Sequence, residues 1–269
     1  MNNSIGHSLF LIAIAVVFAT LGQQAAAQDR MVRSDLQAVF DQHSVTGTFV
    51  LIDPETDRYV VVNEKRADRR MYPASTFKIA NSLIALETRV VEDVEEIIPY
   101  GGRPQPIARW EQDMSMRDAI KVSNVPVYQE IARRIGLDGY AHWLNVLDYG
   151  NQQAGKDVET FWLKGPLKIT PFEQVDFLAL LATQTLAMQM EHQLAVRDIL
   201  RLGRRDDSVL FAKTGWTTAP DPDIGWFVGW VERKGAIYPF ALNIDMKSDA
   251  DAEKREMIAI EMLEALGVY

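Results

Sequence analysis

The stretch "IGWFVGWVERKGAIYPFALNIDM", residues 224–246, decides the fold class. It holds two runs rich in apolar, β-branched and aromatic residues, separated by Lys234-Gly235. A pair of this kind between two such runs is typical of the turn of a β-hairpin. The segments "TGTFVLID" (46–53), "RYVVVN" (58–63) and "SVLFAKTGW" (208–216) have the same character. Because short turns join antiparallel neighbours, these runs predict an antiparallel sheet built from both ends of the chain.

The middle of the chain has helical periodicity instead, from about Thr76 to the Gly203 region. A closing helix is predicted in "ADAEKREMIAIEMLEALG" (250–267), and a short one in "SDLQAVFDQH" (34–43). This order predicts an α/β fold of the α+β type, in which N- and C-terminal helices flank the sheet and an all-helical domain is inserted. The predicted α/β part covers about 28–66 and 206–269, and the helical part about 67–205, with the active site in the cleft between them.

The first 27 residues predict a signal peptide and export to the periplasm. The apolar run from Leu9 to Leu21 is too short for a comfortable membrane span, and Ala25-Ala26-Ala27 resembles a cleavage site before Gln28. An uncleaved membrane anchor is the alternative, because no Lys or Arg precedes the run. After cleavage we expect residues 28–269 to keep no stable membrane span.

Composition narrows the function classes. The chain has 269 residues, a net charge of −9 and no cysteine. The acidic balance and the lack of a basic block argue against nucleic acid as a partner. Without cysteine there is no disulfide and no thiolate metal site, and we expect no bound metal.

The segment "PASTFKIANS", residues 73–82, places Ser75 three positions before Lys78. One interpretation is the solvated polar face of a helix with Ser75 as its N-cap. The other is a nucleophile beside its base, because positions i and i+3 of a helix are neighbours. A lysine base must be neutral or modified, and burial in apolar surroundings lowers its pKa.

A Ser-His-Asp hydrolase or a zinc hydrolase fits this sequence poorly. Residues 28–269 contain only His43, His142 and His192, and no G-x-S-x-G nucleophile elbow is present. The histidines do not form a metal-binding pattern either.

Two further short motifs follow Ser75 in order. Ser123-Asn124-Val125 lies between two predicted helices, and Lys213-Thr214-Gly215 ends a predicted strand. Each motif alone is common, as a helix cap or as a strand leading into a turn. Together and in this order they resemble the related set of Ser-x-x-Lys, Ser-Asp-Asn and Lys-Thr-Gly found in serine β-lactamases and penicillin-binding proteins.

With these residues, the chain resembles class D, oxacillinase-type serine β-lactamases over essentially all of residues 28–269. Val125 stands where class A enzymes have Asn. Tyr149-Gly150-Asn151 resembles the family's Y-G-N element, and "FWLKGPLKIT" (161–170) resembles its omega-loop segment, with Trp162 in the matching place.

The resemblance implies roles for the reacting residues. Ser75 would be acylated by a β-lactam, and Lys78 would be the general base, carried as a carboxylated lysine formed with carbon dioxide or bicarbonate, with no other cofactor. Trp162 would donate its indole N–H to that group, while Phe77, Val125 and Leu163 keep the site apolar. Ser123 would relay a proton to the leaving nitrogen.

The resemblance also implies how substrate is held. The backbone N–H groups of Ser75 and Trp216 would form the oxyanion hole. Residues expected to bind substrate are Val125, Lys213, Thr214, Gly215 and Arg255, with Trp110 at the entrance. The partners expected are small β-lactams, and the chain would be a monomer or a homodimer.

Two alternatives stay open from the sequence. A penicillin-binding transpeptidase or a β-lactam-sensing receptor domain would be acylated at Ser75 without efficient turnover. A non-catalytic periplasmic binding or structural protein would carry these motifs by chance and would not be labelled covalently by a penicillin.

Overall fold

The computed structural model describes residues 29–269, so the predicted signal peptide lies outside the described residues. In that described part of the chain, no helix combines the length and apolar character needed to cross a membrane. The strands are β1 (Arg30–Val32), β2 (Gly47–Asp53), β3 (Arg58–Val62), β4 (Ile97–Ile98), β5 (Met114–Ser115), β6 (Arg201–Arg205), β7 (Ser208–Thr217), β8 (Asp223–Arg233) and β9 (Ala236–Met246).

The helices alternate with short 3-10 turns. The α-helices are α1 (Gln37–Gln42), α2 (Glu64–Ala67), α3 (Lys78–Glu87), α4 (Met116–Lys121), α5 (Val125–Val146), α6 (Phe161–Lys164), α7 (Pro171–Ala182), α8 (Met190–Ile199) and α9 (Lys254–Ala265). The 3-10 turns are η1 (Ser34–Leu36), η2 (Ala74–Phe77), η3 (Ala108–Trp110) and η4 (Asp249–Ala252).

The large sheet has the order β1-β3-β2-β9-β8-β7-β6, so the two ends of the chain meet at β2 and β9. The predicted hairpin is confirmed: Arg233 pairs with Ala236, and Lys234 and Gly235 both have positive φ, as a type I′ turn requires. The predicted antiparallel sheet is confirmed except at one edge, where β1 runs parallel to β3. η1, α1 and β2 separate β1 from β3 in the chain, so no tight turn imposes antiparallel pairing on these two strands.

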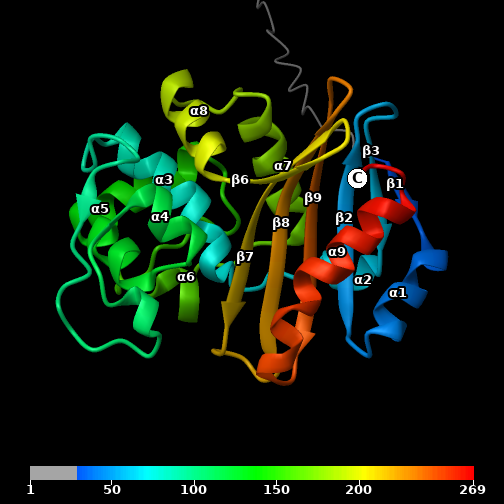
Figure 1. Cartoon of the computed structure of the whole chain (residues 1–269), viewed down its shortest axis with the longest axis horizontal. Helices are drawn as coiled ribbons and strands as arrows, with labels where there is room; N and C mark the ends of the chain where they lie inside the picture. The colour runs from blue at the N-terminus through cyan, green and yellow to red at the C-terminus, as the bar shows by residue number, and fades with distance from the viewer. Residues whose placement is uncertain (1–28) are drawn as a thin grey trace, which may run out of the picture.

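Successive residues of the strands face two different cores. On β2, Phe49 and Leu51 pack with residues of α1 and α9, while Val50 packs with the helices of the other side. This alternation follows the two-residue period of a strand. Figure 1 shows α1 and α9 in front of the sheet, as predicted for the N- and C-terminal helices, and α3 to α6 gathered beyond the β7 edge.

The inserted segment is mainly helical, but not all of it stands apart from the sheet. α7 packs against β9, β2 and β8, and β6 starts at Arg201, before the predicted boundary at about 205. The exact division into domains stays a prediction. The candidate site lies where η2, which leads into α3, packs directly against β7.

Candidate active site

A cleft of about 870 Å³ opens between the sheet and the helical part. Predicted site residues that line it are Ser75, Trp110, Ser123, Val125, Leu163, Thr214, Trp216 and Arg255. Lys78, Phe77 and Trp162 are buried behind this surface, and Lys213 and Gly215 lie within β7 beside it. The structure therefore brings together residues that are up to 180 positions apart, from Ser75 to Arg255.

The Ser75 hydroxyl accepts a hydrogen bond from Lys78 Nζ at 2.9 Å. Ser75 does not cap a helix: it lies inside η2, and Lys78 begins α3. Lys78, Asn81 and Ser82 are all fully buried, so the interpretation of this face as solvated is wrong. Ala74, just before Ser75, has φ +51°, a left-handed conformation that is strained for a residue other than glycine.

Aromatic rings surround the Lys78 amine. The Tyr128 ring centre lies 5.2 Å from Nζ, and Phe77 packs against Trp162 with ring centres 5.7 Å apart. Burial lowers the pKa of Lys78 to about 7, because this environment cannot hydrate an ammonium ion. A substantial share of Lys78 is therefore a neutral amine at neutral pH.

Trp162 presents an unpaired donor in this apolar pocket. Its side chain is fully buried, and within the part of the chain that the structure describes its Nε1–H has no hydrogen-bond partner. Buried indole N–H groups normally have a partner, so this one calls for an explanation. The donor suits an acceptor on the neighbouring lysine, such as a carbamate.

A second serine–lysine pair joins β7 to the segment between α4 and α5. Lys213 Nζ donates a short hydrogen bond to Ser123 Oγ and a further one, of 3.0 Å, to the backbone oxygen of Thr214. Burial lowers the pKa of Lys213 well below its usual value, and the charges of Lys78 and Arg255 lower it further. Ser123, like Ala74, has a positive φ, of +53°.

Gly215 permits the close approach of β7 to the nucleophile segment. A Cβ on Gly215 would lie 3.0 Å from the Thr76 side chain and 3.1 Å from the Pro73 carbonyl oxygen. Any larger residue would push the strand away from η2. The glycine of the Lys-Thr-Gly motif thus has a packing reason beside its predicted place in substrate binding.

Arg255 is held at the cleft by backbone oxygens. Its Nη1 donates to Gly215 O and its Nε to Ala252 O, both at 2.7 Å. The guanidinium lies 5.8 Å from the centre of the Trp216 ring, and Trp216 Nε1 donates to Asp223 at 2.8 Å. Two bonds leave three of the five guanidinium N–H donors, which suits recognition of a carboxylate.

Trp110 is fixed at the rim of the cleft. Its Nε1 donates to Val122 O at 3.0 Å, next to Ser123, and its own backbone oxygen accepts from Asn124 Nδ2 at 3.3 Å. The ring is half-buried and lines the cleft, which agrees with the predicted place at the entrance.

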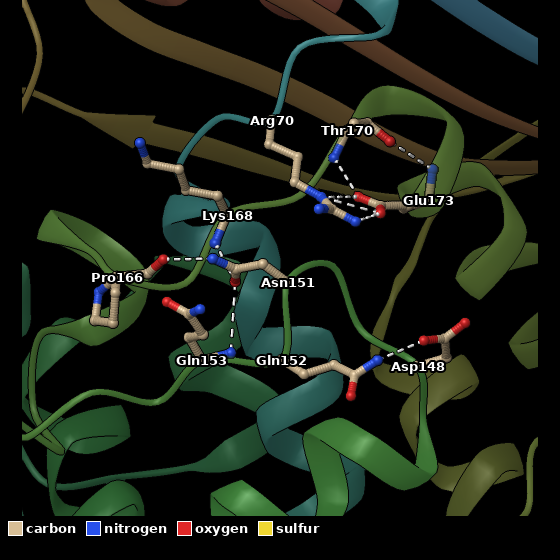
Figure 2. Close-up of polar contacts among 9 residues, drawn as sticks. All are labelled: Arg70, Asp148, Asn151, Gln152, Gln153, Pro166, Lys168, Thr170 and Glu173. Carbon is tan, nitrogen blue, oxygen red and sulfur yellow. Dashed lines mark hydrogen bonds and ion pairs between the residues drawn. The ribbon is translucent and has the colours of Figure 1, made fainter.

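The segment that carries Trp162 is tied back to the Y-G-N element. Asn151 Nδ2 donates to Pro166 O, and Asn151 Oδ1 accepts from Lys168 N, both at 2.9 Å (Figure 2). The next helix starts with a capping box between Thr170 and Glu173, and Arg70 forms an ion pair with Glu173 (Figure 2). Asn151 therefore acts on the shape of this loop.

Comparison with known proteins agrees with this site. Residues 47–264 match the family described as the penicillin binding protein transpeptidase domain. Beta-lactamase OXA-48 of Klebsiella pneumoniae is 37% identical over 255 residues, covering 95% of this chain and 96% of that protein. Beta-lactamase OXA-10 of Pseudomonas aeruginosa is 34% identical over 259 residues, covering 95% and 97%.

A solved structure of the same kind superposes closely. The crystal structure of FUS-1 (OXA-85), a class D beta-lactamase from Fusobacterium nucleatum subsp. polymorphum, gives a TM-score of 0.85 at 41% identity. It covers 88% of this chain and 99% of that chain. The chain belongs to the class D β-lactamases. The resemblance inferred from the three motifs is thereby confirmed, together with the mixed α/β fold.

Several residues around the site of this class D β-lactamase were not predicted. Tyr128 forms the floor of the Lys78 pocket and shares a hydrogen bond of 2.8 Å with Ser82. Tyr72 and Thr217 line the cleft. Tyr128 lies five residues after Ser123, and Thr217 directly follows Trp216. Proximity to the motifs was therefore the available signal in the sequence. The local sequence does not show which residues near a motif direct their side chains toward the site.

Histidines take no part in the cleft of this class D β-lactamase. His43 pairs with Glu261 at 2.9 Å, and His192 pairs with Glu87 at 2.7 Å. No histidine is among the residues that line the cleft, and the described residues contain no cluster of acidic residues and histidines that would hold a metal.

Proposed function

We propose that this chain hydrolyses the amide bond of β-lactam antibiotics through an acyl-enzyme on Ser75. The observation that carries the proposal is the buried Lys78 amine, whose pKa is lowered by burial, at 2.9 Å from the Ser75 hydroxyl. A serine hydroxyl becomes a useful nucleophile only beside such a base. Two relatives similar over 95% of this chain are themselves named β-lactamases, which supports this substrate class.

In the acylation step, Ser75 Oγ attacks the β-lactam carbonyl carbon and its proton passes to the base at Lys78. The oxyanion that develops is stabilised by the backbone N–H groups of Ser75 and Trp216. The carbon–nitrogen bond then breaks, and the ring nitrogen takes a proton delivered through Ser123, whose hydroxyl is hydrogen-bonded to Lys213. In the second step, water attacks the ester and releases Ser75.

Lys78 is proposed to work as a carboxylated lysine. A neutral amine can add carbon dioxide and lose a proton, whereas an ammonium cannot. Carboxylation would supply an acceptor-only anion, able to take a proton in both half-reactions. The unpaired indole N–H of Trp162 and the apolar side chains of Phe77, Val125 and Leu163 are the surroundings that such a group requires. No other cofactor is proposed.

The substrate carboxylate is proposed to bind Lys213, Thr214 and Arg255. Arg255 supplies a guanidinium, a carboxylate beside Lys213 would favour its ammonium form, and Thr214 offers a hydroxyl 3.3 Å from Lys213 Nζ. Gly215 leaves room for the substrate beside the strand, Val125 provides an apolar wall, and Trp110 provides an aromatic one at the entrance.

We further propose that residues 1–27 direct export to the periplasm, where the enzyme would confer resistance to penicillin-type antibiotics. The substrate is a small molecule, and neither nucleic acid nor a stable membrane span enters the proposal. The working form is proposed to be a monomer or a homodimer.

The alternative of a transpeptidase or sensor, acylated at Ser75 without turnover, is not favoured by the comparisons. The distinguishing experiment mixes the enzyme with a hundredfold excess of benzylpenicillin in bicarbonate buffer. Continued loss of β-lactam absorbance far beyond one equivalent supports hydrolysis. Loss that stops at one equivalent, with a stable adduct on the Ser75 peptide in mass spectrometry, would indicate the alternative instead.

A further inference from the structure

Thr217, the last residue of β7, connects two loops at the cleft. Its Oγ1 donates to the backbone oxygen of Leu163 at 2.6 Å and accepts from the backbone N–H of Ala219 at 3.3 Å. The side chain is buried, and the residue lines the cleft. One hydroxyl therefore links the turn after β7 to the α6 segment, which lies more than 50 positions earlier in the chain.

The α6 segment depends on outside contacts for its position. α6 comprises four residues, Phe161–Lys164, and is followed by Gly165 at φ +96°. A helix this short does not hold itself, and its last backbone oxygens lack partners within the helix. Leu163 O is one of these oxygens, and Thr217 supplies its donor.

The same segment packs against η2, the turn directly before Lys78, and its Trp162 ring contacts Phe77. Trp162, with its unpaired N–H, directly precedes Leu163, which lies on the cleft side. A shift of the Leu163 backbone would therefore move the indole donor and admit water to the amine. Water would favour the ammonium form of Lys78, which cannot add carbon dioxide.

We propose that Thr217 is a positioning residue for Lys78: its hydroxyl holds the α6 turn in place, so that the amine stays dry and the unpaired Trp162 N–H keeps its buried position next to Phe77. The inference rests on the proposed function, because it concerns the carboxylation of Lys78. In this proposal Thr217 acts through the surroundings of Lys78 and does not contact the reacting atoms.

The test compares three variants. Thr217→Val keeps the shape and Thr217→Ala removes bulk, and both lack the hydroxyl, whereas Thr217→Ser retains it. Thr183→Val is the matched control, because exposed Thr183 makes the same kind of bond, to Ala179 O, away from the cleft. For each protein we would measure the bicarbonate concentration for half-maximal activity, the carbon-13 carbamate signal after labelling, and the melting temperature.

Loss of the hydroxyl should raise the half-maximal bicarbonate concentration about fivefold, the size expected for one buried hydrogen bond. The carbamate signal at fixed bicarbonate should fall in parallel, while Thr217→Ser and Thr183→Val stay within about twofold of the wild type, less than the effect of one such bond. Using both Val and Ala keeps the test valid if one of them fails to fold.

The outcomes separate this inference from the proposed function. If wild-type enzyme does not turn over penicillin, the proposed function is wrong whatever Thr217 does. If the wild type is active but Thr217→Val and Thr217→Ala lower only the melting temperature, with unchanged bicarbonate dependence and carbamate signal, Thr217 is merely structural and the inference is overturned. A rise in KM alone would overturn it as well, since that would assign Thr217 to substrate contact.

Discussion

Two buried lysines lie beside the cleft, Lys78 at the start of α3 and Lys213 on β7, and each is hydrogen-bonded to a serine hydroxyl. Lys78 bonds to Ser75, and Lys213 bonds to Ser123. Burial lowers the pKa of both lysines. They differ in what else surrounds the amine.

The Lys78 amine has aromatic surroundings and a single oxygen acceptor, Ser75 Oγ. Lys213 has three oxygens within reach, from Ser123 and from the backbone and side chain of Thr214. An ammonium has three donors, so these oxygens can accept hydrogen bonds from the charged form of Lys213, although burial and the charges of Lys78 and Arg255 lower its pKa well below the usual value. Lys78 has one such acceptor. Arg255 lies near Lys213, and a substrate carboxylate there would favour the charged form again.

The comparison shows that a hydrogen-bonded lysine and serine can have different roles, proton transfer or anion binding, according to what surrounds the lysine amine. An apolar pocket turns a lysine into a base, and a ring of oxygens beside a second cation turns it into an anion-binding group. The predictions below test this division between the two pairs.

Ser75→Ala and Ser123→Ala should separate the two pairs most strongly. Loss of the nucleophile should reduce kcat/KM for nitrocefin by on the order of 10⁴ or more, because removing a member of a catalytic unit disables the unit. Ser123→Ala should cost about 10²-fold to 10³-fold, the usual range for a proton-transfer group. A fluorescent penicillin should label Ser123→Ala but not Ser75→Ala on a denaturing gel. Turnover by Ser75→Ala at a near wild-type rate would refute the division.

Trp162→Phe should impair the Lys78 pair alone. The ring is kept and the N–H is lost, so the carbamate should weaken and deacylation should slow by about 10²-fold, the cost of one preorganised donor. Stopped-flow mass spectrometry would show acyl-enzyme accumulating. Trp230→Phe is the control, because that buried indole donates to Glu232 away from the cleft. Equal effects of both variants would show that the change is one of stability.

The pH profile should report the titration of Lys78. Its pKa in the folded protein, about 7, lies below the ordinary value, so the neutral amine prevails above that pH and the ammonium below it. With limiting bicarbonate, kcat should fall about tenfold per pH unit below 7, following the neutral fraction. Added bicarbonate should restore activity near the midpoint. A profile that is the same in degassed and bicarbonate buffer would mean that Lys78 works without carboxylation.

Arg255→Ala should act on the Lys213 side and chiefly raise KM. Loss of a charged, bidentate partner should raise KM for benzylpenicillin about tenfold, with a smaller change in kcat. The control substrate is the same penicillin with its carboxylate esterified, for which KM should change little. An equal rise for the ester would show that Arg255 acts through its bonds to Gly215 and Ala252 instead.

The sequence was sufficient to predict the features that depend on residues close together in the chain. Alternating apolar residues and the Lys234-Gly235 turn specify the β8–β9 hairpin, since side-chain direction along a strand follows from position alone. The contact between Ser75 and Lys78 was also predictable, because residues three positions apart in a helical segment are neighbours. The order of the three motifs indicated the family that the comparisons later confirmed.

Only the tertiary structure decided which polar face is buried. On a helical wheel, Lys78, Asn81 and Ser82 form the polar side of α3, yet all three are buried. α5 packs against α3, and its Tyr140 and Tyr128 hydroxyls are hydrogen-bonded to Asn81 and Ser82. The parallel pairing of β1, the Tyr128 floor, the unpaired Trp162 donor and the Thr217–Leu163 bond are likewise contacts between distant segments. Periodicity tells in which direction a side chain points. What it meets there, and hence whether a lysine is a solvated cation or a neutral base, depends on elements that arrive from elsewhere in the chain.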